Sequence, residues 1–153
     1  METIETVNHF LHQLSAIVWL GGLLALNVVQ LLLRTDRAGL APLLRLSDLY
    51  GRAVIAPAGI ITLLTGIVLV AQMDDVEWTD LWVIWGFAGI ALSLGIGATA
   101  IRVNNAELRR IAGDGAGDEV QLSDGQRRAA ILYGVNLVVL LSTVWAMVFK
   151  PTV

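Results

Sequence analysis

Residues 8–33 read NHFLHQLSAIVWLGGLLALNVVQLLL, and this stretch decides the fold. It stays apolar over more than the ~20 residues that a helix needs to cross a hydrocarbon core of ~30 Å. Backbone groups inside lipid must hydrogen-bond within their own segment, so the stretch predicts a transmembrane helix. It also holds both histidines of the chain, His9 and His12, which makes it the first place to look for chemistry.

Three further apolar runs follow. The four predicted spans cover about residues 7–33, 53–73, 81–101 and 129–149. Hydrophobic residues make up 56% of the 153 residues and the mean hydropathy is +0.73, whereas soluble domains carry roughly 45–50% apolar residues. The runs are continuous and not alternating, which argues against a β-barrel. We therefore predict an all-α membrane protein, a single four-helix up-and-down bundle over residues 1–153, with membrane lipids as partners and no nucleic acid.

The arginines predict the orientation, because they occupy only two of the connections between spans. The first connection holds Arg34, Arg37, Arg45 and Arg52, and the third holds Arg102, Arg109, Arg110, Arg127 and Arg128. The N-terminal segment and residues 74–80 contain no Arg or Lys. Loops rich in Arg and Lys stay in the cytoplasm. The pattern predicts a multi-pass protein of the bacterial plasma (inner) membrane, with both arginine-rich connections cytoplasmic and both termini outside.

The polar residues of the first span fall on one face of the predicted helix. At ~100° per residue this face carries His9, His12, Ser15, Trp19, Asn27 and Gln30. Polar side chains on an otherwise aliphatic membrane helix should face protein, and Asn27 and Gln30 fit helix–helix hydrogen bonds. A matching stripe on the fourth span consists of Tyr133, Asn136, Leu140, Thr143, Met147 and Lys150. Asn27 and Asn136 both lie ~10–12 Å from an arginine-rich end, so we predict that they are near each other.

Small residues form a face on two other spans. On the third span this face consists of Gly86, Gly89, Ser93, Gly97 and Ala100, and on the second span of Gly59, Thr62 and Gly66. Small residues at this spacing allow helix backbones to approach closely. Packing within the bundle is the simplest interpretation. For the third span a subunit interface, and hence a homo-oligomer, is the alternative.

Single residues predict local features of the helices. Pro42 suits the first residue of a helix that leads into the second span, and Ser123 suits the cap of a helix that leads into the fourth. Pro57 lies inside the second span and should bend it.

The tryptophans divide by depth. Those near the outer ends of their spans, as expected of an aromatic belt, are Trp78, Trp82, Trp85 and Trp145. Trp19 lies seven residues deeper than His12 on the same face, which predicts a core residue or the wall of a site.

The two histidines are the best candidate ligands. Their i, i+3 spacing places them on one side of the first span, near its outer end. Imidazole binds copper, zinc and iron, but the chain has no cysteine and no three-ligand motif of a zinc hydrolase. Haem needs only one or two axial ligands. Two interpretations stay open: His12 is the axial metal ligand of haem b, or His12 hydrogen-bonds a neighbouring helix while His9 lies in water. The other candidate cofactor-binding residues are His9, Trp19, Met73 and Met147, the two methionines lying at inward, outer-end positions.

Three short motifs resemble one group of four-helix membrane proteins. His12 followed by Trp19-Leu20-Gly21-Gly22 resembles the first helix of the group, and residues 56–66, APAGIITLLTG, resemble the second. Residues 145–151, WAMVFKP, resemble the ending of its uncharacterised families. The group includes HemJ-type protoporphyrinogen oxidases, the copper-resistance D domain and predicted integral membrane proteins with no assigned function. The chain is most similar to the last of these.

The resemblance implies a haem role for His12, because a first-helix histidine is tied to haem in HemJ-type enzymes. That family also has a lysine early in the third helix, where residues 78–85 of this chain read WTDLWVIW. The missing lysine argues against porphyrinogen oxidation, and histidines and methionines are sparse for copper carriage. Three hypotheses remain. The first is a haem-b-binding membrane protein with a redox or electron-transfer role, an oxidoreductase with a redox partner protein. The second is a non-catalytic scaffold or accessory subunit that associates through its small-residue faces, and the third is a porphyrinogen oxidase or copper permease.

Overall fold

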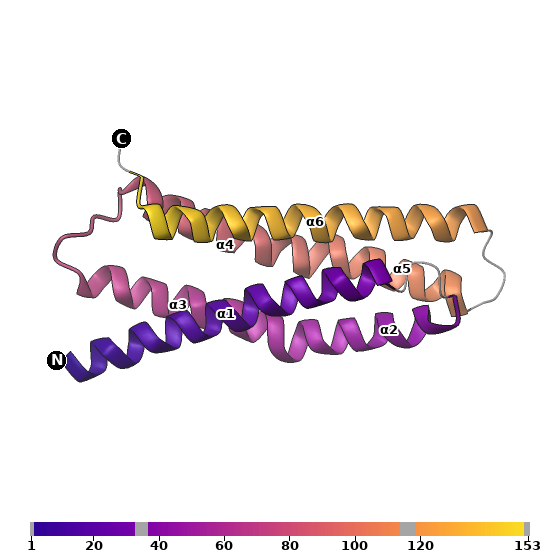
Figure 1. The fold of residues 1–153 in the computed structure, drawn as a ribbon, viewed down its shortest axis with the longest axis horizontal. Helices are drawn as coiled ribbons and strands as arrows, with labels where there is room; N and C mark the ends of the chain where they lie inside the picture. Colours follow the sequence, from indigo (N-terminus) through magenta and orange to yellow (C-terminus); the bar gives the residue numbers. More distant parts are fainter. Residues whose placement is uncertain (1, 33–36, 114–118, 152–153) are drawn as a thin grey trace.

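The computed structural model describes residues 2–32, 37–113 and 119–151, which form helices and short connections. The elements are α1 (Glu2–Leu32), α2 (Arg37–Tyr50), the π-helical turn η1 (Gly51–Ile55), α3 (Ala56–Gln72), α4 (Leu81–Ile96), the π-helical turn η2 (Gly97–Ile101), α5 (Arg102–Gly113) and α6 (Glu119–Phe149). Because α2, η1 and α3 follow one another without a break, as do α4, η2 and α5, these elements make four long rods (Figure 1).

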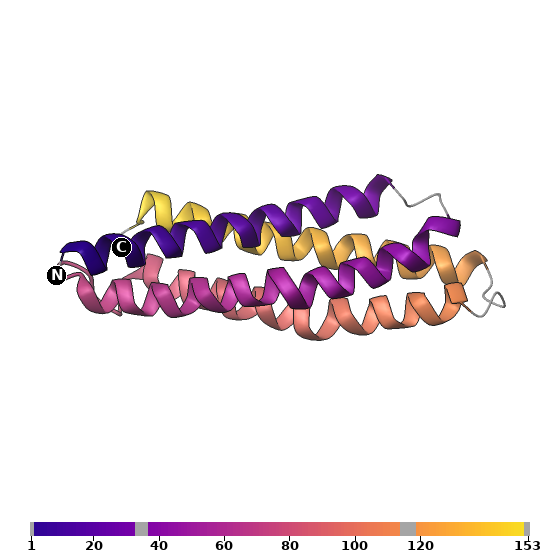
Figure 2. The same ribbon diagram turned by 90° about the horizontal axis from the view of Figure 1, so that it is seen from below.

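The rods alternate in direction, so the N- and C-termini lie at the same end of the bundle (Figures 1 and 2). Among the described residues, four helical stretches are long and apolar enough to cross a membrane: Thr3–Leu31, Pro42–Gln72, Leu81–Ala112 and Glu119–Phe149. The predicted four-helix membrane bundle is confirmed. A helix of this length measures ~46 Å against a hydrocarbon core of ~30 Å. The rods therefore exceed the apolar spans, and most of the excess is the polar sequence of α2, α5 and the start of α6, at the arginine-rich end.

Two helix pairs form the bundle: α1 packs along α3, and α4 packs along α6. The predicted small faces lie in these contacts. A Cβ atom at Gly59 would lie 2.8 Å from Leu94 Cδ2 and 3.0 Å from Trp19 Cε2. On α4, a Cβ at Gly86 would lie 2.8 Å from Met147 Cε, and one at Gly89 would overlap the Thr143 side chain. Gly86 and Gly89 of the small face of the third span thus pack within the chain, as the simpler interpretation had it, whereas nothing lies within 4 Å of a Cβ at Gly97.

The two local predictions of helix starts are wrong. Pro42 lies inside α2, which begins at Arg37, and Ser123 lies inside α6, which begins at Glu119. The Ser123 hydroxyl donates to the Val120 carbonyl at 2.9 Å and caps nothing. Both helices start earlier because their first turns pack at the arginine-rich end, where Leu40 and Leu122 are buried.

Pro57 lies directly after the π-helical turn η1, at the start of α3. A proline removes one backbone donor from a helix, and a wider turn before it accommodates the change. Figure 1 shows the rod bending where α2 passes into α3.

An ion-pair cluster joins α2 to α5 at the arginine-rich end. Asp48 Oδ2 lies 2.7 Å from Arg52 Nη2 and 2.9 Å from Arg109 Nη1. The Asp48 side chain is only 10% exposed, so its negative charge depends on these two guanidinium groups.

We expect Gly89→Ala to lower the free energy of unfolding by ~1–3 kcal/mol, because the new methyl group overlaps Thr143 and overpacks the α4–α6 contact. Gly95→Ala on the same helix is the matched control: nothing lies within 4 Å of its Cβ position, and stability should stay or rise by up to ~1 kcal/mol. Unfolding in detergent measures both. Equal losses in the two variants would contradict the packing assignment, and a partial rescue by Thr143→Ala would locate the overlap.

Asp48→Asn should lower the free energy of unfolding by ~1–3 kcal/mol, because it weakens two charged hydrogen bonds at a largely buried site. Glu107→Gln is the control. Glu107 pairs with Arg110 on an exposed face of α5, where such a pair contributes only ~0–1 kcal/mol. The same unfolding assay separates the two. A loss no greater for Asp48→Asn than for Glu107→Gln would show that the cluster does not hold α2 to α5.

Candidate functional site

A seam of polar side chains joins α1 to α3 in the half of the bundle that carries the termini. Asn8 Nδ2 donates to the Thr65 carbonyl at 3.2 Å. Two turns further along α1, the Ser15 hydroxyl donates to the His12 carbonyl at 3.0 Å, and the Thr62 hydroxyl donates to Ser15 Oγ at 2.9 Å. His12 and Ser15 of the stripe predicted for the first span therefore face α3, and their hydrogen bonds align the two helices at this level, whereas Asn27 further along the stripe donates to α6.

His12 is held in one orientation by this seam. Its Nδ1 atom lies 3.0 Å from the Thr62 carbonyl oxygen and 3.1 Å from Thr65 Oγ1. A carbonyl oxygen can only accept, so the proton of the neutral imidazole sits on Nδ1. The lone pair is then on Nε2, which has no hydrogen-bond partner among the described residues. Metal-binding histidines usually have this arrangement, with the second nitrogen donating to a carbonyl or carboxylate.

His12 lines a cavity of about 480 Å³, which we call the histidine cavity. All four rods contribute to its walls, and its volume lies within the ~300–1,000 Å³ typical of small-molecule and cofactor sites. The lining is mostly apolar; its larger members are Leu20, Leu69, Trp82, Phe87, Ile90 and Val144. At one edge is Lys150, whose Nζ lies 5.0 Å from the centre of the Trp82 ring.

Four of the five candidate cofactor residues line this one cavity. His9, Met73 and Met147 join His12 there, although they come from three different helices or their ends. His9 is exposed and Met73 is 36% exposed, whereas Met147 is partly buried against the core. Trp19 does not join them. Its side chain is 3% exposed and lines a different cavity, closer to the arginine-rich end.

Two glycines lie directly against the side chains of candidate ligands. A Cβ at Gly66 would lie 3.3 Å from His12 Cε1, and a Cβ at Gly86 would lie 2.8 Å from Met147 Cε. Each side chain thus rests against bare backbone of the facing helix. The sequence marked these glycines as packing positions, and here the packing partner is a candidate ligand.

Asn27 and Asn136 both point into the bundle and not toward its surface, but no hydrogen bond between them is recorded among the described residues. Asn27 Nδ2 donates to the Leu23 carbonyl at 2.9 Å and to the Tyr133 carbonyl, one turn before Asn136, at 3.4 Å. Asn136 is 1% exposed, and its Oδ1 atom has no partner in the described part of the chain. The two amides line separate cavities.

The arrangement offers a small set of soft ligands. In the described ranges, no three His, Asp or Glu side chains gather closely enough to hold a metal ion. One imidazole nitrogen and two thioether sulfurs around an apolar cavity instead suit the iron of a haem, whose four equatorial ligands come with the cofactor.

A family model matches residues 6–151, almost the whole chain, and is described as predicted integral membrane protein (DUF2269). The chain belongs to this family. Membership confirms the membrane class that the motifs of the first, second and fourth spans predicted. It shows no link to the HemJ-type oxidases or to the copper-resistance D domain. No curated protein and no solved structure matches the chain.

Sequence reasoning missed the residues that fix His12. Thr65 and the backbone of Thr62 anchor the imidazole, and Asn8 supports Thr65. The sequence does contain a signal for these residues. Thr62 and Thr65 are hydroxyl residues at i, i+3 within an apolar span, and His9 and His12 on the facing helix have the same spacing.

Proposed function

We propose that this DUF2269 protein binds haem b in the histidine cavity and has a redox or electron-transfer role in the membrane. The observation that supports this most is the state of His12, whose Nδ1 is tied to the Thr62 carbonyl while Nε2 is left free beside an apolar cavity. When bound, haem iron would supply a one-electron redox couple. The chain's own residues orient the ligand and exclude water.

The methionines are the candidates for the second axial position. Met147 rests on Gly86 and Met73 ends α3, and both line the same cavity as His12. Lys150 lies at the edge of the cavity, where its ammonium group would suit a carboxylate of the cofactor. A second subunit of a homo-oligomer is the other source of an axial ligand.

The scaffold hypothesis loses part of its basis. It relied on the small faces of the second and third spans, and Gly59, Gly86 and Gly89 lie against side chains of the same chain. Gly97 of the third span, by contrast, has nothing within 4 Å of its Cβ position.

We further propose the orientation that the arginines predict: the plasma membrane of a bacterium, with the arginine-rich connections in the cytoplasm. The histidine cavity lies in the half of the bundle that carries the termini, so the haem would sit toward the outer leaflet. A redox partner protein would then approach from the outside.

Protein purified from haem-replete cells should show a Soret band, and His12→Ala should remove it while His9→Ala keeps it. The difference is expected because His12 is anchored by α3 and His9 is exposed. Visible spectra measure the haem, and thermal unfolding of each variant checks the fold. A colourless, folded wild-type protein would refute the proposal, as would a Soret band that survives in His12→Ala.

The lack of native cysteine allows a direct test of orientation. Asp75→Cys, in the connection between α3 and α4, should react with a membrane-impermeant maleimide in intact cells. Asp124→Cys, on the exposed start of α6, should react only after the membrane is opened. The reverse pattern would show that the orientation is inverted and that the proposed haem faces the cytoplasm.

A further inference from the structure

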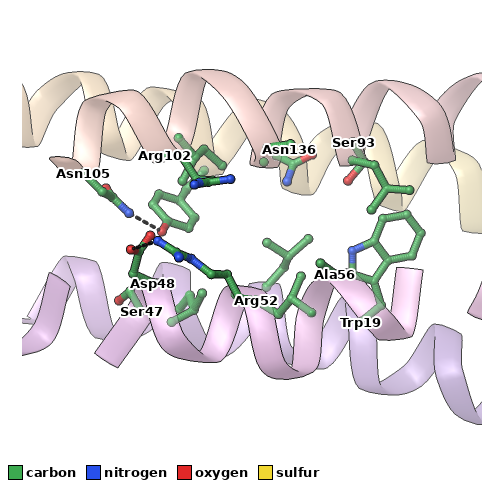
Figure 3. A pocket seen from close by; sticks show the side chains of 18 of the residues that line it. Trp19, Ser47, Asp48, Arg52, Ala56, Ser93, Arg102, Asn105 and Asn136 are labelled. Carbon is green, nitrogen blue, oxygen red and sulfur yellow. Dashed lines mark hydrogen bonds and ion pairs between the residues drawn. The ribbon is translucent and has the colours of Figure 1, made fainter. Parts of the chain in front are cut away.

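A second cavity, of about 310 Å³, lies in the arginine-rich half of the bundle, and we call it the serine–asparagine cavity. Its opposing walls come from the rod α2–η1–α3 and the rod α4–η2–α5, and residues of α1 and α6 complete it (Figure 3). It shares no lining residue with the histidine cavity. The proposed haem site therefore does not account for it.

Four polar side chains of this cavity have an oxygen atom without a hydrogen-bond partner in the described part of the protein. They are Ser47 (Oγ), Ser93 (Oγ), Asn105 (Oδ1) and Asn136 (Oδ1), each between 1% and 3% exposed. An unsatisfied buried polar group costs ~1–3 kcal/mol, so a cluster of them in one cavity requires an explanation. A ligand that hydrogen-bonds to them provides one.

Ser93 and Asn136 are the two that lie deep in the bundle. Ser93 is nine residues from Arg102, and Asn136 is eight residues from Arg128. That places both side chains ~12–14 Å inside the arginine-rich boundary, at the depth of lipid tails. In the view of Figure 3 both lie on one side of the cavity, and the Trp19 indole projects from the other side.

This pair of side chains calls for a ligand oxygen that can both accept and donate. The Ser93 hydroxyl can donate, whereas a carbonyl oxygen such as Asn136 Oδ1 can only accept. The rest of the lining is mostly apolar, including Leu23, Leu26, Ile55, Ile60, Leu94 and Ile101 beside Trp19. The lining therefore fits a neutral ring that bears a hydroxyl group and carries an apolar tail.

The cavity opens on the surface between the two rods. Ile60 on α3 and Ala98 on η2 are exposed and also line the cavity. The two π-helical turns, η1 and η2, each contribute lining residues, so the irregular segment of each rod lies at this site. Such segments occur often at functional sites.

We propose that the serine–asparagine cavity binds a quinol from the membrane, whose ring hydroxyl can accept from Ser93 and donate to Asn136 Oδ1. The ring oxygen lies at Ser93 and Asn136, the ring beside Trp19, and the tail leaves between Ile60 and Ala98. The proposal concerns residues that the haem site does not use, so either one can fail without the other.

An anionic phospholipid fits the cavity less well. Arg52 and Arg102 line the arginine-rich end of the cavity and would attract a phosphate group. Arg52, however, already pairs with Asp48, and the acyl chains below a phosphate would leave Ser93 and Asn136 unsatisfied. Arginines at this level also follow from the positive charge of cytoplasmic boundaries alone.

The test uses the full chain in detergent micelles and a decyl-substituted benzoquinol as the probe. We expect saturable binding, seen as a rise of the melting temperature and as quenching of tryptophan fluorescence. Ser93→Ala and Asn136→Leu should each weaken binding about three- to tenfold, the effect of one lost hydrogen bond. Ala98→Phe should weaken it as well, because the ring fills the opening. Ser142→Ala, which removes a hydroxyl of α6 that bonds the Val139 carbonyl away from the cavity, should change nothing.

A second readout separates a binding role from a structural one. Without probe, Ser93→Ala should melt at or above the wild-type temperature, because it removes an unpartnered hydroxyl group. A lower melting temperature would mean that Ser93 makes a structural hydrogen bond, which contradicts the proposal. Since Asn136→Leu could misfold, Ser93→Ala and Ala98→Phe carry the test by themselves.

Three further results would overturn the proposal. Absence of saturable probe binding to the wild type would indicate a cavity filled only by water. Binding that persists in Ser93→Ala and Ala98→Phe would place the probe elsewhere. Stabilisation by phosphatidylglycerol nanodiscs, lost in Arg102→Gln and unaffected by Ser93→Ala, would assign the cavity to an anionic lipid. His12→Ala should leave probe binding unchanged, whatever its effect on haem.

Discussion

Every polar group inside a membrane bundle must find its partner within the bundle, because lipid offers none. This constraint shapes the chain described here. Along α1 and α3, the side chains of Asn8, His12 and Ser15 and the residues Thr62 and Thr65 satisfy one another. The contact between these helices is therefore specific and not merely apolar, since sliding one helix past the other would leave several hydrogen-bond donors without partners at once.

Because of the same constraint, a buried polar group without a hydrogen-bond partner is informative. Ser93 and Asn136 lie as deep in the bundle as the satisfied seam, yet an oxygen atom of each has no partner in the described ranges. Their neighbours are not loosely packed everywhere: Gly89, one turn from Ser93, is in direct contact with Thr143. The bundle is thus tight on one side of these residues and hollow on the other. A chain selected only for packing would carry apolar side chains at two such positions, so their polarity is better explained by something that enters the hollow.

Much of the architecture could be predicted from the sequence because hydropathy and helical periodicity report burial directly. The stripe through Ser15 and Trp19 and the small face through Gly86 and Gly89 are buried as predicted. The ends of the helices could not be predicted in this way. Pro42 and Ser123 are good local start signals, but the helices begin earlier because their first turns bury Leu40 and Leu122 in contacts between distant segments. The π-helical turns could not be predicted from the sequence either. The only residue that points to one of them is Pro57, the second residue of α3, which follows the first turn.

The candidate sites show a second limit of helical periodicity. It predicts which face of a helix a residue lies on, but not the depth at which neighbouring helices separate to form a cavity. His12 and Trp19 share one face of α1, and the sequence placed them in one site. They are seven residues apart, ~10 Å along the axis, and their side chains line different cavities. Likewise on α4, Ile90 lines the histidine cavity and Ser93, one turn further on, lines the serine–asparagine cavity. On α4 the two cavities are therefore about one helical turn apart. Both are mostly apolar, but one offers histidine nitrogen and methionine sulfur and the other offers serine and asparagine oxygen, so the two proposed ligands would be close neighbours along the axis of a single bundle.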